Sequence, residues 1–97
     1  MRNYEVMYII RPEVEQEAVQ AIVDKYNGII ENGGGEVTKT DIIGKRRLAY
    51  EIEKRIREGI YVLVDFSATP EVVNEMDRVM KIQDEILRFM VVKKEVA

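Results

Sequence analysis

The residues of this chain best suited to chemistry are three adjacent cations, Lys45, Arg46 and Arg47, because ammonium and guanidinium groups bind phosphates. They follow Gly44 and precede residues 48–52, where apolar residues alternate with others as in a strand with one buried face. Adjacent exposed cations repel each other by up to about 1 kcal/mol per pair, so they do not stabilise a fold. We therefore predict contact with an anionic partner such as a phosphate backbone; a solvated turn is the alternative.

The charges of the chain are unevenly distributed. A formal net charge of −3 is unusual for a nucleic-acid-binding domain. However, residues 39–57 hold seven cations against three anions, whereas residues 11–36 hold two cations against six anions. One face can therefore meet phosphate while another faces solvent or a basic protein. The further cations that could extend a phosphate-binding surface are Arg2, Lys54, Arg55, Arg57, Arg88, Lys93 and Lys94.

The composition argues against an enzyme, a metal site, a cofactor and a small-molecule substrate. The chain has no His and no Cys, which removes thiol chemistry, most zinc sites and the commonest general base. The closely spaced acids of residues 13–17 and 51–53 lie in charge-rich stretches typical of a solvated surface. The glycines of residues 33–35 follow a helical pattern instead of opening one, so we interpret them as a helix C-cap and not as a phosphate cradle.

The length and composition predict one globular domain over residues 1–97. Of the 97 residues, 46% are apolar and 34% charged, which is the ordinary globular range. No apolar run approaches the length of a membrane span, and the start of the chain does not resemble a secretory leader. The absence of Cys fits a cytoplasmic protein.

Hydrophobic periodicity predicts four strands and two helices in the order βαββαβ. The expected strands are residues 3–10, two strand-like pieces at 36–43 and 48–53, residues 60–66 and residues 86–92. The two pieces are either separate or one long bent strand interrupted near Gly44. The first expected helix is residues 14–31, with Ala18, Ile22, Tyr26 and Ile29 or Ile30 facing inward. The second begins with Thr69 as N-cap, and one of its faces carries Val72 or Val73, Met76, Val79 or Met80, and Gln83. Residues 54–58 are expected to form a charged turn closed by Gly59.

This order indicates an α+β, ferredoxin-like fold, in which both helices pack on one face of a four-stranded antiparallel sheet. The second and fourth strands are then its edges. One parity of strand residues should form the core under the helices: Tyr4, Val6, Tyr8, Ile10, Ile60, Val62, Val64, Phe66, Phe89 and Val91. The opposite parity should form an apolar outer face: Met7, Ile9, Tyr61, Leu63, Met90 and Val92.

An apolar outer face suggests a partner protein, because a sheet face left to water normally carries polar residues. The alternative is that a small sheet simply exposes some apolar side chains. RNA-recognition-motif domains share this topology and stack bases on aromatics of the central strands, but residues 60–66 lack their motif and Tyr61 alone has the outward parity. The sequence therefore favours phosphate contacts and recognition of RNA shape.

The segment Gly44-Lys45-Arg46-Arg47-Leu48-Ala49-Tyr50-Glu51-Ile52 resembles the signature of the S-six family of bacterial small-subunit ribosomal proteins. Residues 1–6 and 88–93 are also similar to that family. The resemblance implies a ferredoxin-like fold and a structural role in the cytoplasmic ribosome. It also implies binding to the central domain of small-subunit ribosomal RNA and a heterodimer with the small basic ribosomal protein S-eighteen.

The resemblance assigns roles to the residues above. By matching positions, the RNA-binding candidates are Arg2, Lys45, Arg46, Arg47, Arg88 and Lys93, with Lys54, Arg55, Arg57 and Lys94 as possible additions. The partner-protein surface would consist of Met7, Ile9, Tyr61, Leu63 and Met90. A different class of function stays open from the residues alone, namely a ferredoxin-like regulatory or ligand-binding domain that self-associates through the sheet face.

Overall fold

The computed structural model describes residues 1–47 and 57–94, and it confirms the predicted element order. The elements are β1 (Arg2–Ile10), α1 (Gln16–Asn32), β2 (Glu36–Arg47), β3 (Glu58–Ala68), α2 (Pro70–Ile82) and β4 (Ile86–Lys93). No helix in this described part is both long enough and apolar enough to cross a membrane.

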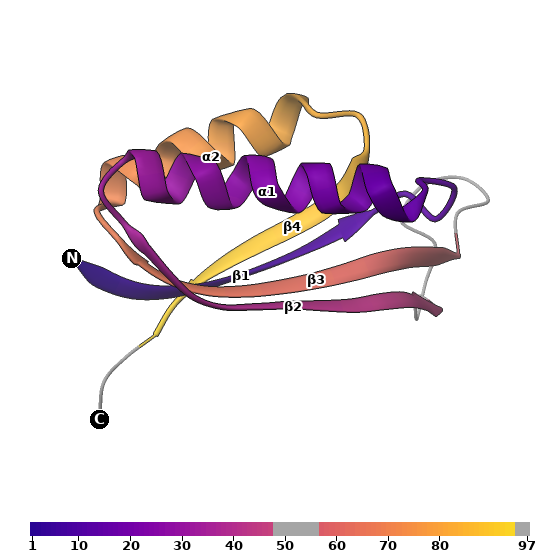
Figure 1. Cartoon of the computed structure of the whole chain (residues 1–97), viewed down its shortest axis with the longest axis horizontal. Coiled ribbons are helices and arrows are strands. Elements are labelled where there is room, and N and C mark those ends of the chain that lie inside the picture. Colours follow the sequence, from indigo (N-terminus) through magenta and orange to yellow (C-terminus); the bar gives the residue numbers. More distant parts are fainter. Residues whose placement is uncertain (48–56, 95–97) are drawn as a thin grey trace.

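The four strands form one antiparallel sheet in the order β2-β3-β1-β4. Both helices lie on the same face of this sheet, and among residues 1–47 and 57–94 no helix covers the opposite face (Figure 1). Strands β2 and β4 are the edges, as the sequence predicted, because the two-helix βαββαβ connectivity places β1 and β3 in the middle. The ferredoxin-like fold is therefore confirmed.

The core lies between the sheet and the helices and contains the predicted residues of β1 and β3, from Tyr4 to Ile10 and from Ile60 to Phe66. On β4 the predicted residues Phe89 and Val91 are only partly buried, because an edge strand is covered on one side alone.

The prediction that Ala18 of α1 faces inward was wrong. Val19 is buried in its place and Ala18 is exposed, because the inward stripe of α1 is centred one residue later.

Both helix termini predicted around Gly33 and Thr69 are confirmed in position. Helix α1 ends where Gly34 adopts a φ of 87°, and the N–H groups of Gly33 and Gly35 donate to the carbonyls of Ile29 and Ile30 at 3.2 and 2.8 Å. This is the C-cap role that glycine serves well. Thr69 occupies the N-cap of α2, but its hydroxyl makes no capping hydrogen bond.

Two glycines expected to interrupt a strand and to close a turn lie inside strands. Gly44 belongs to β2, at a register shift between Ile42 and Gly44, so the expected interruption is a bulge. Gly59 belongs to β3, and the predicted turn therefore ends before Glu58. A Cβ on Gly59 would lie 2.2 Å from Cγ2 of Ile9, so close packing requires glycine there. The predicted strand 48–53 and residues 54–56 of the predicted turn lie outside the described residues.

A pair of tyrosines occupies the middle of the core. The rings of Tyr8 and Tyr26 meet edge to face, with centroids 5.7 Å apart. The hydroxyl of Tyr26 donates a hydrogen bond to Gln83, whereas the buried hydroxyl of Tyr8 has no partner in the described structure. Burial raises the pKa of Tyr8, and burial together with Glu85 raises the pKa of Tyr26 to about 12.

The orphan hydroxyl of Tyr8 predicts that Tyr8→Phe raises the free energy of unfolding by about 1 kcal/mol, since a buried unsatisfied hydroxyl carries a desolvation cost. Tyr26→Phe is the matched control and should lower it by about 1 kcal/mol, because the hydrogen bond to Gln83 is lost and Lys25 alone still donates to that oxygen. Urea unfolding at pH 7 measures both. A larger loss for Tyr8→Phe than for Tyr26→Phe would contradict this interpretation.

The same tyrosines predict alkaline sensitivity. Their pKa in the unfolded chain is near 10.0 and both are higher in the folded protein, so the unfolded state ionises first as pH rises. Their contribution to stability is complete below pH 10.0 and falls as pH rises through about 12. Unfolding free energies measured between pH 9 and 12 should decline less steeply in Tyr8→Phe, whereas equal slopes would argue against a buried, neutral Tyr8.

Candidate nucleic-acid interface

The three adjacent cations lie at the end of the sheet where β2 ends and β3 begins. Lys45, Arg46 and Arg47 are the last residues of β2, and all three are exposed. The sequence placed them directly ahead of a strand, with a solvated turn as the alternative, whereas the structure holds them within β2 by backbone pairing with Ile60, Gly59 and Glu58. A paired edge strand positions its side chains more rigidly than a loop does.

The alternation of the strand places these cations on both of its faces. Lys45 lies opposite Ile60, whose side chain is buried on the helix side, and Arg46 lies opposite Gly59 on the outer side. The Nη1 of Arg46 donates to the carbonyl of Lys45 at 2.9 Å. Arg47 lies opposite Glu58, which offsets part of its charge. Lys45 and Arg46 therefore present charge on the two sides of one edge.

The bulge before these cations determines their parity. Gly44 has a φ of 100°, and a Cβ built on it would meet no atom within 4 Å. Glycine is therefore required there by the backbone conformation and not by crowding. The extra residue at the bulge shifts every later residue of β2 to the opposite face from an uninterrupted strand. The face on which Arg46 projects thus depends on Gly44.

The other predicted RNA contacts divide into two groups at opposite ends of the sheet. Exposed Arg57 directly precedes β3 at the cationic end, and exposed Arg88 lies on β4 opposite Ile9. Arg2 lies opposite Ala68, nine residues along β3 from Gly59, which is about 30 Å away at the rise of a strand. Lys93 is at the Arg2 end, opposite Tyr4. Lys54 and Arg55 lie outside the described residues.

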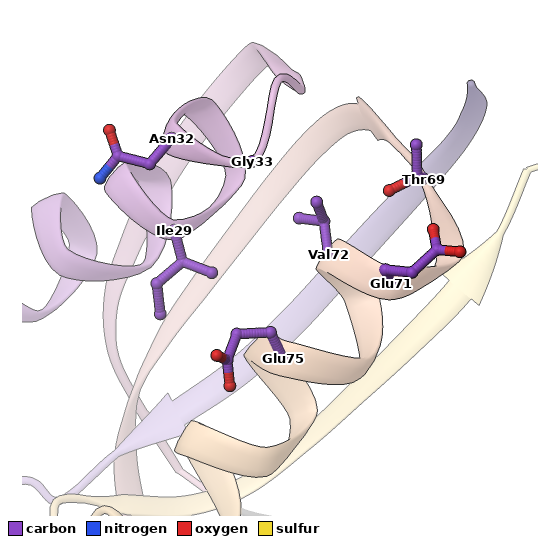
Figure 2. A pocket seen from close by; sticks show the side chains of 7 residues that line it. All are labelled: Ile29, Asn32, Gly33, Thr69, Glu71, Val72 and Glu75. Carbon is purple, nitrogen blue, oxygen red and sulfur yellow. The ribbon is translucent and has the colours of Figure 1, made fainter.

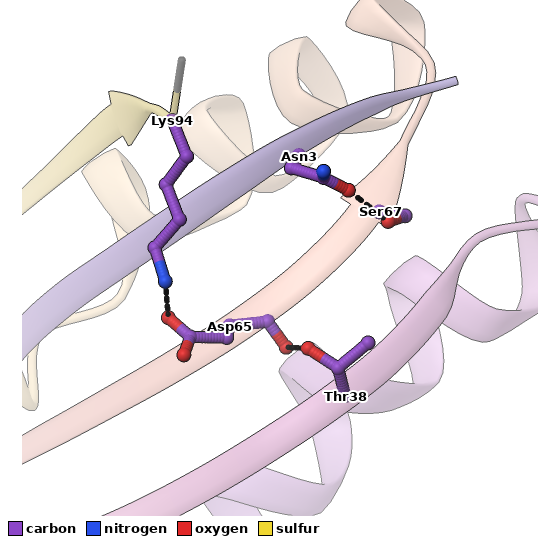
Figure 3. A network of polar contacts seen from close by, with 5 residues as sticks. All are labelled: Asn3, Thr38, Asp65, Ser67 and Lys94. Atoms are coloured by element: carbon purple, nitrogen blue, oxygen red, sulfur yellow. Dashed lines mark hydrogen bonds and ion pairs between the residues drawn. The ribbon is translucent and has the colours of Figure 1, made fainter. Parts of the chain in front are cut away.

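Lys94 takes part in a polar network that crosses the outer face at the Arg2 end (Figure 3). Its Nζ lies 3.0 Å from Oδ1 of Asp65 on β3, and its backbone N–H donates to the carbonyl of Asn3 on β1 at 2.8 Å. The network is continued by Thr38, whose Oγ1 donates to the Asp65 carbonyl at 3.0 Å, and by Ser67, which donates to Asn3 at 2.5 Å. Lys94 therefore links β4 to β3 across β1, which no local sequence pattern could have indicated.

The outer face contains a row of apolar residues across three strands. Leu63, Met7 and Met90 are aligned on β3, β1 and β4, and Met90 is 54% exposed. Tyr61 is half-buried in the next row. Ile9 differs from the expectation of an exposed surface: it is only 3% exposed and packs against Gly59, so it offers little area to a partner.

Acidic residues border this apolar row, and the sequence reasoning missed them. Glu5, Asp41 and Asp65 line a small hollow together with Lys39 and Leu63. Their signal was present, because Glu5 and Asp65 have the outward parity of their strands and lie directly opposite each other. Within residues 1–47 and 57–94, no acidic cluster is arranged to hold a metal ion.

Comparisons with known proteins agree on one family. The family described as Ribosomal protein S6 matches residues 3–93. Small ribosomal subunit protein bS6 of Desulforamulus reducens is 60% identical over 94 residues, which cover 97% of this chain and 98% of that protein. The bS6 protein of Exiguobacterium sibiricum is 53% identical over 95 residues, covering 98% of this chain and 99% of that protein.

A solved structure of the same family agrees with this result. The crystal structure of 30S ribosomal protein S6 from Thermotoga maritima superposes with a TM-score of 0.89 at 32% identity, covering 96% of this chain and 87% of that one. The C-terminal domain of the MgtC protein from Mycobacterium tuberculosis has a TM-score of 0.62 at 14% identity, covering 98% of this chain and 89% of that one. This second likeness concerns the fold alone.

The positive φ of Gly44 predicts that Gly44→Ala lowers the free energy of unfolding by about 1–2 kcal/mol through backbone strain alone. Gly28→Ala is the matched control, since it also has open space around it but lies in α1. That change should raise stability by about 0.5–1 kcal/mol, because alanine favours helix. Urea unfolding of both variants checks the pair, and a neutral Gly44→Ala would exclude a strained bulge.

Proposed function

This chain belongs to the ribosomal protein S6 family of the small ribosomal subunit, and from that premise we propose that it binds small-subunit ribosomal RNA through the cationic end of its sheet. Its role is structural and not enzymatic, and its place is the cytoplasmic ribosome. The observation that carries the proposal is the exposure of Lys45, Arg46 and Arg47 on a paired edge strand.

The geometry favours contacts to phosphate and not to base edges. Lys45 and Arg46 extend from the two sides of β2, so together they reach phosphates across a groove or at a helix junction. The outer face is poorly suited to stacking of RNA bases, because Tyr61 is half-buried and its neighbours in the same row, Ile9 on β1 and Arg88 on β4, are not aromatic. Binding of this kind recognises the shape of folded RNA, and the central domain of the small-subunit RNA is the proposed target.

The Arg2 end of the sheet is a second, weaker contact region in this proposal. Arg2 and Lys93 are exposed there, about 30 Å from the cationic end by the strand rise. Lys94 is partly committed to Asp65. We place Arg88 and Arg57 with the principal region because they lie toward its end of β4 and β3.

We further propose that the outer face binds the small basic ribosomal protein S-eighteen as a heterodimer. Met7, Leu63 and Met90 provide an apolar row, and burying it is favourable at about 25 cal/mol per Å². The bordering carboxylates Glu5 and Asp41 suit a basic partner. A second copy of this chain is a less favourable partner, because the acidic residues of the two copies would then repel each other across the interface.

RNA binding is tested by replacing Lys45, Arg46 and Arg47 together with Ala. The loss of about three phosphate contacts should reduce the slope of log affinity against log salt by about 2–3 and weaken binding to all RNA sequences alike. Anisotropy with a fragment of the central domain, over a range of KCl concentrations, measures both quantities in the presence and absence of the basic partner.

The control for this variant is a triple replacement of Lys25, Arg78 and Lys81 on the helices, which removes the same charge from the other side of the molecule. We expect its affinity and salt slope to stay near those of the unaltered protein. Equal losses in both triple variants would mean that only net charge matters, and the assignment to the cationic end would be wrong.

Partner binding is tested with Met90→Lys, which places a cation in the apolar row opposite a basic protein. The affinity for S-eighteen, followed by size-exclusion chromatography with light scattering over a range of concentrations, should fall by tenfold or more. The stability of the fold should change little, because Met90 is 54% exposed. Ile82→Lys is the control, being an exposed apolar residue on α2 at 71%. A stable homodimer that ignores the basic protein would support self-association instead.

A further inference from the structure

A groove lies on the helix side of the molecule, where the end of α1 meets the start of α2 (Figure 2). Its volume is about 480 Å³, within the range of ligand-binding clefts. Its lining residues are Ile29, Asn32, Gly33, Thr69, Glu71, Val72 and Glu75. Neither the cationic end of the sheet nor the outer face contributes to it.

The floor of the groove is apolar and shaped by one glycine. Ile29 of α1 and Val72 of α2 lie on its two sides, as Figure 2 shows. A Cβ on Gly33 would lie 2.4 Å from Cγ2 of Val72, so glycine permits the close approach of the two helices. The floor is therefore fixed by packing and not by exposed mobile side chains.

The rim of the groove is acidic. Glu71 and Glu75 line it, and none of the lining residues is a cation. Glu75 is paired with Arg78 at 2.6 Å, whereas Glu71 has no ion pair within residues 1–47 and 57–94. The hydroxyl of Thr69 makes no capping hydrogen bond and remains available to a ligand. The polar groups of the groove are thus suited to a hydrogen-bonding cation.

The surrounding surface strengthens this preference. The segments that meet at the groove, residues 26–36 and 69–77, together hold five anions and no cation. Both segments lie at this end of the helix layer, so the groove is surrounded by an excess of negative charge. Such a region repels RNA phosphates and attracts basic polypeptide.

We propose that this groove docks a short basic segment of a second protein. An aliphatic side chain of that segment rests on Ile29 and Val72, and a neighbouring Lys or Arg meets Glu71 and Glu75. Charge complementarity selects this occupant over a nucleic acid. The site is separate from the RNA-binding and partner surfaces proposed above and does not depend on them.

A hexapeptide of alternating arginine and leucine, capped at both ends, is the probe. We expect saturable shifts of amide resonances in ¹⁵N spectra of the full chain at low salt, centred on Ile29, Gly33 and Glu71. Glu71→Lys should weaken the binding by tenfold or more. Glu17→Lys makes the same charge change on an exposed residue of α1 that does not line the groove, and should weaken it less than threefold.

Three outcomes would overturn the proposal. The first is equal weakening by Glu71→Lys and Glu17→Lys, which would reveal only general attraction between opposite charges. The second is a set of shifts centred on Met7, Leu63 and Met90, which would place the peptide on the outer face. The third is equally tight binding in the groove of a peptide with glutamate in place of arginine, or of a single-stranded RNA hexamer.

Discussion

The rest of the structure depends on the pairing of β1 with β3, which runs without a shift from Arg2 opposite Ala68 to Ile10 opposite Ile60. In this register each residue of one strand shares its face with its partner. Tyr4 therefore stacks on Phe66, with ring centroids 5.5 Å apart, and the core parity of both strands lies under the helices. Slipping β1 by one residue would bring Glu5 into the core and expose Tyr4 and Tyr8, and slipping β3 would do the same with Asp65 and Phe66.

The sequence predicted this pairing because the evidence for it is local. Alternation from Tyr4 to Ile10 and the dense apolar run from Ile60 to Phe66 reveal strand parity, and the βαββαβ order then leaves one natural arrangement. The departures from prediction at two glycines have a common cause. Gly44 was expected at an interruption of a strand and Gly59 at the end of a turn, because glycine favours such positions, but their roles depend on a bulge and on the side chain of Ile9 across the sheet.

The candidate site was predicted less completely than the fold for the same reason. Residue type and family resemblance identified Lys45, Arg46 and Arg47, but their distribution over two faces follows from the register shift before Gly44. Arg2 lies at the opposite end of the sheet from these cations, and Lys94 forms an ion pair with Asp65. Both facts depend on contacts between residues distant in the sequence. The groove at Gly33 depends on the approach of two helices, which no periodic pattern encodes.

The contact of Gly59 with Ile9 also constrains how this protein can evolve. These two positions are 50 residues apart, yet a methyl group on Gly59 would overlap Cγ2 of Ile9. The two residues are therefore not independent: a larger residue at 59 is acceptable only after position 9 has become smaller. Neither step alone is favourable, since the first creates a clash and the second a cavity. Packing between Gly59 and Ile9 therefore constrains the sequence of β3 beside the cationic end, although neither residue is proposed to bind RNA.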